Sequence, residues 1–114
     1  MTRVLVAGAH NFYDREWCYR ALDAIHKDRQ ISLIIEGGAR GTDTLARDWA
    51  QAQNVKFRTF PAQWELYLGD AGWIRNREML KVGKPDLFVP FPGGEFTRDL
   101  IAQAAIEGVP IRWP

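Results

Sequence analysis

The sequence predicts an α/β fold, a small Rossmann-like three-layer domain with a parallel sheet of about five strands. Three observations predict it. Short apolar runs alternate with amphipathic helical patterns along the chain, two of these runs lead directly into glycine turns that open a helix, and 114 residues suffice for one hydrophobic core. Alternation of strand and helix favours right-handed crossovers with helices on both faces. Residues 1–114 are therefore expected to form one domain.

Five apolar runs are interpreted as strands: Arg3–Ala7, Ile31–Ile35, Val55–Phe60, Leu87–Phe91 and Val109–Trp113. The run Ile31–Ile35 is apolar without alternation, which is typical of a parallel strand covered on both faces. The run Val55–Phe60 alternates, which predicts a position nearer an edge of the sheet, and Pro61 ends it.

Four helices are expected between these strands. Asp14 caps the first, in which Trp17 and three later apolar residues recur at helical spacing. The others are expected over Thr42–Gln53, Trp73–Val82 and Thr97–Glu107, and glycines follow the last two. Residues 62–72 form the least regular stretch, for which no element is predicted.

Composition narrows the function classes. The chain has 15 basic and 14 acidic side chains, a net charge of +1, so nothing global favours nucleic acid or a membrane surface as a partner. Cys18 is the only cysteine, which fits a reducing compartment. With no signal peptide and no apolar run of about 20 residues, a soluble, cytoplasmic protein is expected, and a homodimer is plausible for so small a domain.

Two glycine turns, at residues 36–43 and 91–97, follow predicted strands and open predicted helices. Such turns bring backbone N–H groups to the positive end of a helix, where a phosphate binds well. The alternative is that the glycines only permit tight turns. The expected ligand-binding residues lie on these turns and on the loop after the first strand: Gly8, His10, Gly37, Gly38, Arg40, Gly41, Thr42, Asp43, Pro92, Gly93, Gly94 and Thr97.

The segment Ile74–Met79 adds Arg75, Asn76 and Arg77 to this group. Two arginines two residues apart on a helix point about 200° apart, so we expect one of them to reach the cleft beside Asn76. The alternative is that both lie on the surface. Among the aromatic residues in loops, Phe12, Trp64 and Tyr67 are candidates to stack on a base. His10 and His26 are isolated, so no metal site is predicted.

Together these segments resemble a known family. Val4–Gly8, Gly37–Asp43, Ile74–Met79 and Phe91–Gly94 occur in order and at a spacing similar to that of the YspA and cpYpsA-related members of the SLOG superfamily, the domain of unknown function 2493 group. The resemblance covers nearly the whole chain. It implies a Rossmann-like domain that binds nucleotides or nucleotide-derived signals, often in phage and mobile-element settings. The wider superfamily includes LOG phosphoribohydrolases and DNA-binding DprA proteins.

The departures from the family pattern concern catalysis. His10 stands where relatives commonly carry arginine, and Trp73 replaces the proline of a Gly-Pro-Ile-Arg-Asn-Arg motif. In the LOG-type turn, Phe96 occupies the position of the second glycine and Leu100 that of the glutamate, although Thr97 is kept. Glycosidic cleavage needs a carboxylate that stabilises charge or activates water. Glu36, Asp43 and Asp99 are candidates, but none occupies the matching position.

The sequence thus predicts a module that binds a nucleotide or a derivative such as ADP-ribose or NAD. Gly38, Arg40 and Gly41 would hold one phosphate, and Asp43 would contact ribose. A nucleotide is the expected ligand and no further cofactor is assigned. Two alternatives stay open: a LOG-like N-glycosidic hydrolase acting on nucleoside monophosphates or NAD-like molecules, and a DprA-like DNA-associated module. The near-neutral charge weighs against the last one.

Overall fold

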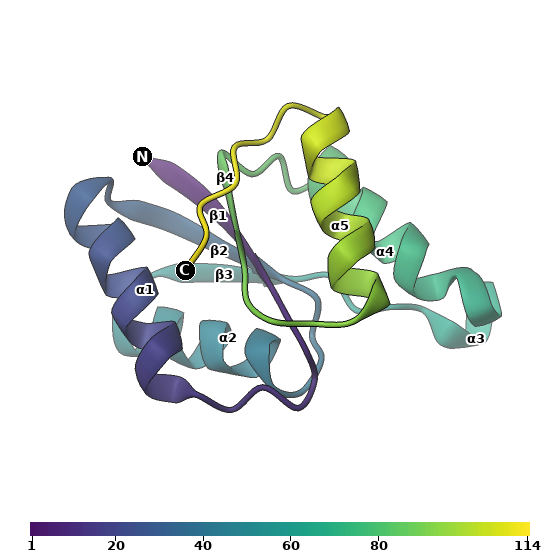
Figure 1. Cartoon of the computed structure of the whole chain (residues 1–114), viewed down its shortest axis with the longest axis horizontal. Coiled ribbons are helices and arrows are strands. Elements are labelled where there is room, and N and C mark those ends of the chain that lie inside the picture. The colour runs from purple at the N-terminus through teal and green to yellow at the C-terminus, as the bar shows by residue number, and fades with distance from the viewer.

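The computed structural model describes all 114 residues, and strands alternate with helical segments along the chain (Figure 1). The strands are β1 (Thr2–Ala7), β2 (Ile31–Glu36), β3 (Lys56–Thr59) and β4 (Leu87–Pro90). The helices are α1 (Arg15–Asp28), α2 (Thr42–Ala52), α3 (Trp64–Tyr67), α4 (Ala71–Lys81) and α5 (Glu95–Ile106), with a short 3-10 turn η1 (Leu68–Asp70) between α3 and α4. None of the helices combines the length and the apolar composition needed to cross a bilayer.

The four strands form one parallel sheet in the order β3-β2-β1-β4. The chain first builds outward from β1 to β2 and β3, and then returns to place β4 on the other side of β1. The order of strands therefore reverses between β1 and β4. In open parallel sheets, ligands bind beyond the carboxyl ends of the strands at such a reversal.

Helices cover both faces of the sheet, as predicted (Figure 1). Val4 and Val6 of β1 belong to the cluster of buried residues that includes Leu22 of α1 and Trp49 of α2. The alternate residues of β1 belong to a second cluster that includes residues of α4 and α5, among them Leu80 and Leu100. Because successive side chains of a strand point to opposite faces, one apolar strand supplies both cores. The three-layer α/β class is confirmed.

The predicted fifth strand at 109–113 is wrong. Only Ile111 pairs with the sheet, as an isolated parallel bridge to Phe88. Phe88 N donates to Pro110 O and Arg112 N donates to Phe88 O, both at 2.9 Å. Pro110 and Pro114 have no N–H group to extend this pairing, and Trp113 is 66% exposed. The sheet therefore has four strands.

The stretch predicted to be irregular contains short helical turns. α3 and η1 lie between residues 64 and 70, and α4 begins at Ala71, two residues before the predicted Trp73. β3 occupies an edge of the sheet, as predicted, although it spans only Lys56–Thr59.

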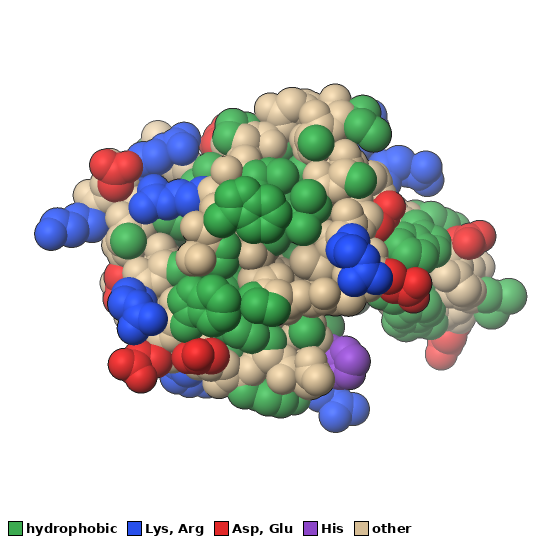
Figure 2. All heavy atoms as spheres, viewed as in Figure 1, with side chains coloured by type: hydrophobic (Ala, Val, Ile, Leu, Met, Phe, Trp, Pro, Cys, Tyr) green, Lys and Arg blue, Asp and Glu red, His purple; other side chains and the backbone are tan.

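Figure 2 shows hydrophobic side chains gathered around the α3 end of the molecule, where Leu66 and Leu68 are 65% and 72% exposed.

Candidate functional site

A pocket of about 640 Å³ opens at the carboxyl ends of the strands. It lies where the loops after β1, β2, β3 and β4 meet the start of α4, next to the reversal of strand order between β1 and β4. Its size falls within the range of small-molecule sites. The lining residues are Ala7, Gly8, Ala9, His10, Asn11, Gly37, Gly38, Ala39, Asp43, Pro61, Ala62, Trp64, Arg75, Asn76, Met79, Gly94, Glu95, Phe96, Thr97 and Leu100.

Two N–H groups of the first glycine turn, residues 36–43, already donate to carboxylates. Gly38 N donates to Glu36 Oε1 at 2.7 Å, and Ala39 N donates to Asp43 Oδ2 at 3.1 Å. Thr59 Oγ1 donates to Glu36 Oε2, which joins the turn to β3. Glu36 is fully buried beneath the turn and does not line the pocket. The first turn therefore presents the carboxyl group of Asp43 to the site, and the N–H groups of Gly38 and Ala39 are already engaged.

The same turn is fastened to the loop that follows β1. Thr42 N and Thr42 Oγ1 both donate to Ala9 O, at 3.3 and 3.1 Å. Gly41 has φ +71°, and a Cβ there would lie 2.5 Å from His10 O. That conformation and that close approach both require glycine. Gly41 and Thr42 consequently hold two loops together and do not line the pocket.

Asp43 is the one carboxylate of the three catalytic candidates that lines the pocket. Burial is the largest of the causes that raise its pKa to about 7, and neighbouring Glu36 raises it further. The Ala39 N–H and Arg75 act in the opposite direction. Burial also raises the pKa of Glu36. A carboxyl that titrates near neutrality inside a cleft is a recognised mark of a functional site.

Arg75 lies at the centre of the site, and its contacts join α4 to the first turn. Nη1 donates to Gly37 O at 3.1 Å and Nε donates to Asn76 Oδ1 at 3.2 Å. Burial lowers the pKa of Arg75, whereas Asp43 and Glu36 raise it. The guanidinium stays charged and forms no ion pair within the chain. It therefore keeps N–H donors for an anionic group of a ligand.

Asn76 connects this centre to the second glycine turn. Its Nδ2 donates to Phe96 O at 2.9 Å and to Asp99 Oδ2 at 3.0 Å. Asp99 also accepts a bond of 2.7 Å from Gln103 and does not line the pocket. Asp99 therefore holds Asn76 in place from outside the cavity.

The second glycine turn, residues 91–97, is open. Gly94 is the N-cap residue of α5, and no side chain caps the helix there. A Cβ on Gly94 would meet nothing within 4 Å. Gly94, Glu95, Phe96 and Thr97 line the pocket, so the first turn of α5 faces it. The first N–H groups of a helix have no intrahelical partner, and an anion is stabilised beside them.

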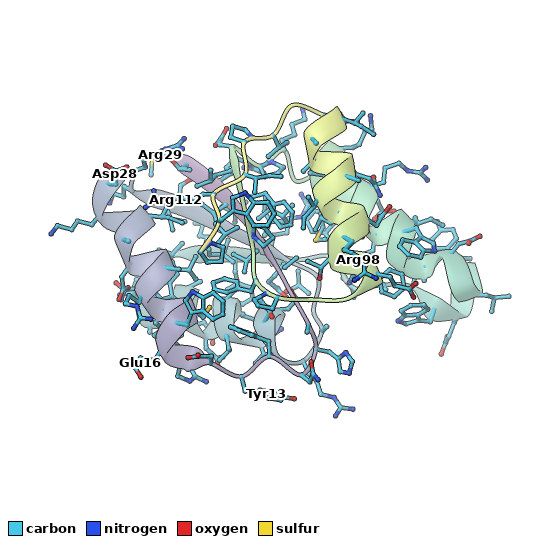
Figure 3. The ribbon with its side chains drawn as sticks, viewed as in Figure 1. Tyr13, Glu16, Asp28, Arg29, Arg98 and Arg112 are labelled. Atoms are coloured by element: carbon cyan, nitrogen blue, oxygen red, sulfur yellow. The ribbon has the colours of Figure 1, made fainter.

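Pro92 and Gly93 face the other side of this turn. They line a separate depression of about 300 Å³ together with Arg98, which Figure 3 shows near the start of α5. Ala9 N donates to Pro92 O at 2.8 Å, so the second turn is also fastened to the loop after β1.

An aromatic wall closes the pocket on the α3 side. The ring of Phe96 lies 4.4 Å from that of Trp73 and 6.1 Å from that of Trp64, centroid to centroid. Gly72 makes room for Phe96, because a Cβ on Gly72 would collide with that ring. Trp64 lines the pocket and is 50% exposed, which leaves part of its indole available to a ligand.

Nine of the predicted binding residues line the pocket: Gly8, His10, Gly37, Gly38, Asp43, Arg75, Asn76, Gly94 and Thr97. Six do not: Arg40, Gly41, Thr42, Arg77, Pro92 and Gly93. Arg40 and Arg77 are exposed, and Arg75 is the arginine beside Asn76. Of the aromatic candidates, only Trp64 lines the pocket, because Phe12 packs on Trp17 and Phe91 in the core.

Sequence reasoning missed several lining residues, among them Asn11, Ala39, Ala62 and Met79. Most carry no distinctive chemistry, and only their place beside the glycine turns could have suggested them. Phe96 and Leu100 were noted as departures from the LOG-type turn, and both line the pocket.

Comparison with known proteins agrees with this architecture. Residues 2–67, more than half of the chain, match the YAcAr family, described as the YspA, cpYpsA-related SLOG family. The chain is also 34% identical over 119 residues to the Gene 61 protein of Mycobacterium phage D29, an alignment that covers 97% of this chain and 94% of that protein. The fold, the pocket and these matches define a SLOG-type α/β domain. The chain belongs to the YspA, cpYpsA-related SLOG family.

Proposed function

We propose that this protein binds a nucleotide or a nucleotide derivative in the pocket at the carboxyl ends of its strands. The observation that carries the proposal is the pairing of an uncapped helix N-terminus at Gly94 with the half-buried, charged Arg75 in the same cavity. Both groups attract an anion. Membership of the SLOG family, which suggests a nucleotide-related function, supports the proposal.

The contacts suggest how the ligand lies. Its phosphate sits on the first turn of α5, beside Gly94 and Thr97, because the N–H groups there have no side-chain cap. The first glycine turn is a poorer place for a phosphate, since Glu36 and Asp43 already accept from its N–H groups. The base then extends toward Trp64, whose exposed indole can stack on it.

Calorimetry with AMP, ADP-ribose and NAD tests the proposal, with adenosine as the matched ligand that lacks a phosphate. We expect at least one phosphorylated ligand to bind about tenfold or more tightly than adenosine, the ratio expected for one charge-assisted hydrogen bond. A thermal-shift series with the same ligands gives an independent readout. If no ligand of the series binds or raises the melting temperature, the proposal is wrong.

A second function is N-glycosidic cleavage of the bound nucleotide, and one observation favours it. Asp43 lines the pocket and has a pKa of about 7, which suits a general acid or base at neutral pH. Leu100 opposes it, because an apolar side chain lines the pocket at the position where the LOG-type turn has glutamate. Chromatography of AMP, NAD and ADP-ribose after incubation separates the two: we expect intact ligand, and release of free base that stops in Asp43→Asn would establish cleavage.

A further inference from the structure

Asp43 combines burial with an oxygen atom that faces the pocket. The side chain belongs to a residue that is 7% exposed, and its Oδ2 accepts from Ala39 N. No side chain donates to Oδ1. No fully buried side-chain oxygen in the protein lacks a hydrogen-bond partner, so Oδ1, which accepts no hydrogen bond, keeps some exposed surface, and Asp43 lines the pocket. It can accept a hydrogen bond from a ligand.

The charges around Asp43 restrict which ligand group fits there. The charge of Glu36 raises the pKa of Asp43, and Arg75 is the one cation whose charge lowers the pKa of both carboxyl groups. A second phosphate placed here would meet the carboxyl group of Asp43, with that of Glu36 buried beneath the turn. A hydroxyl group is the better guest, because it is neutral and donates a proton to a carboxylate.

We infer that the first glycine turn is a sugar-hydroxyl subsite, in which Asp43 Oδ1 accepts from the vicinal diol of a ribose. The site would thereby distinguish ribonucleotides from nucleotides that lack one of these hydroxyls. The inference rests on the proposed function, since it places the sugar of the same ligand whose phosphate lies on α5. It goes beyond that function, because a nucleotide site need not read the sugar.

Calorimetry with AMP, 2′-deoxy-AMP and 3′-deoxy-AMP tests the inference on the wild-type protein. We expect AMP to bind about tenfold or more tightly than at least one deoxy analogue, since a hydrogen bond to a charged acceptor is lost. If the three bind within about twofold of one another, the sugar inference is wrong and nucleotide binding stands. If none of them binds, both the inference and the proposed function fail.

The variant Asp43→Asn shows whether Asp43 is the group that reads the sugar. Asparagine keeps an oxygen for Ala39 N but presents an amide NH₂ to the pocket in place of the acceptor. We expect the preference for AMP over the deoxy analogue to fall to about threefold or less. A preserved preference would assign the sugar contact to another residue and overturn the inference.

Asp48→Asn is the matched control. Asp48 lies on the same helix, does not line the pocket and pairs with Arg15 at 3.1 Å. This variant should keep the full preference for AMP. Melting temperatures of both variants, measured without ligand, separate a loss of sugar recognition from a loss of folded protein. An Asp48→Asn variant that is folded but has lost the preference would also contradict the assignment to Asp43.

Discussion

The two glycine turns of this protein share a sequence signature and differ in what their N–H groups do. In the first turn, Glu36 and Asp43 accept from Gly38 N and Ala39 N. In the second turn, no side chain caps α5, and Gly94 faces open space. Carboxylates of the protein therefore accept from N–H groups of the first turn, whereas the second turn keeps a partial positive charge that can attract a ligand. A glycine turn before a helix can bind an anion only where its N–H groups have no acceptor within the protein.

The largest effect expected from this comparison is on stability, at Gly41. Gly41→Ala forces a side chain into a positive-φ conformation and toward His10 O, so we expect a loss of about 3 kcal/mol or more in the free energy of unfolding. Gly94→Ala, the matched change in the second turn, should cost less than about 0.5 kcal/mol. Urea denaturation of both variants measures the difference. Equal losses in the free energy of unfolding would contradict the expected difference between the two turns.

The next effect concerns pH. The pKa of Asp43 is about 7 in the folded protein against an ordinary 3.8, so folding takes up a proton between these values. The contribution of Asp43 to stability is therefore lost as the pH rises through that window. Asp43→Asn should be more stable than the wild type by about 1–3 kcal/mol at pH 8, and about equal to it near pH 4.

Denaturation curves across this pH range check the prediction. Glu36, whose pKa is also raised, should leave a residual slope of the same sign in the variant. Asp48→Asn removes only a partly exposed ion pair and should shift stability by less than about 0.5 kcal/mol at every pH. A wild-type stability that does not fall between pH 4 and pH 8 would contradict the burial of an ionisable Asp43.

A smaller effect separates the two arginines nearest the first turn. Arg75 lines the pocket and Arg40 is exposed outside its lining. We expect Arg75→Gln to weaken AMP binding about tenfold or more, and Arg40→Ala to change it by about twofold at most. Calorimetry of both variants provides the comparison. A larger loss of affinity for Arg40→Ala than for Arg75→Gln would contradict this prediction and would indicate that the phosphate binds at the first turn.

Much of the fold could be predicted from the sequence, because periodicity reports burial directly. The uninterrupted run Ile31–Ile35 indicated a strand covered on both faces, and its residues enter both buried clusters. The alternating run before Pro61 indicated a strand nearer an edge, and β3 lies at an edge of the sheet. The prediction of the last strand was wrong because a short apolar run says little about how many backbone hydrogen bonds form with the neighbouring strand. Pro110 and Pro114 limit this pairing to a bridge.

The position of the site could be predicted from the sequence, but the hydrogen-bond partners of its residues could not. The sequence located both glycine turns, but not the carboxylates that occupy the first one. Glu36 meets Thr59 because the two residues are partners in the β2–β3 register, which no local pattern reveals. Arg40 stands in the middle of the turn in sequence, whereas Arg75, 38 positions from Gly37, makes the contact. Tertiary packing, rather than proximity along the chain, determines which arginine contacts the first turn.

The most direct test of the account is AMP and adenosine binding to Gly94→Asp, with Gly94→Asn as the uncharged control. Both side chains suit an N-cap position and have room there, so neither variant should lose stability. The aspartate places a carboxylate where the phosphate is expected to bind. We predict that Gly94→Asp loses the preference for AMP over adenosine, by about tenfold or more relative to Gly94→Asn. A Gly94→Asp variant that still prefers AMP as the wild type does would contradict the account.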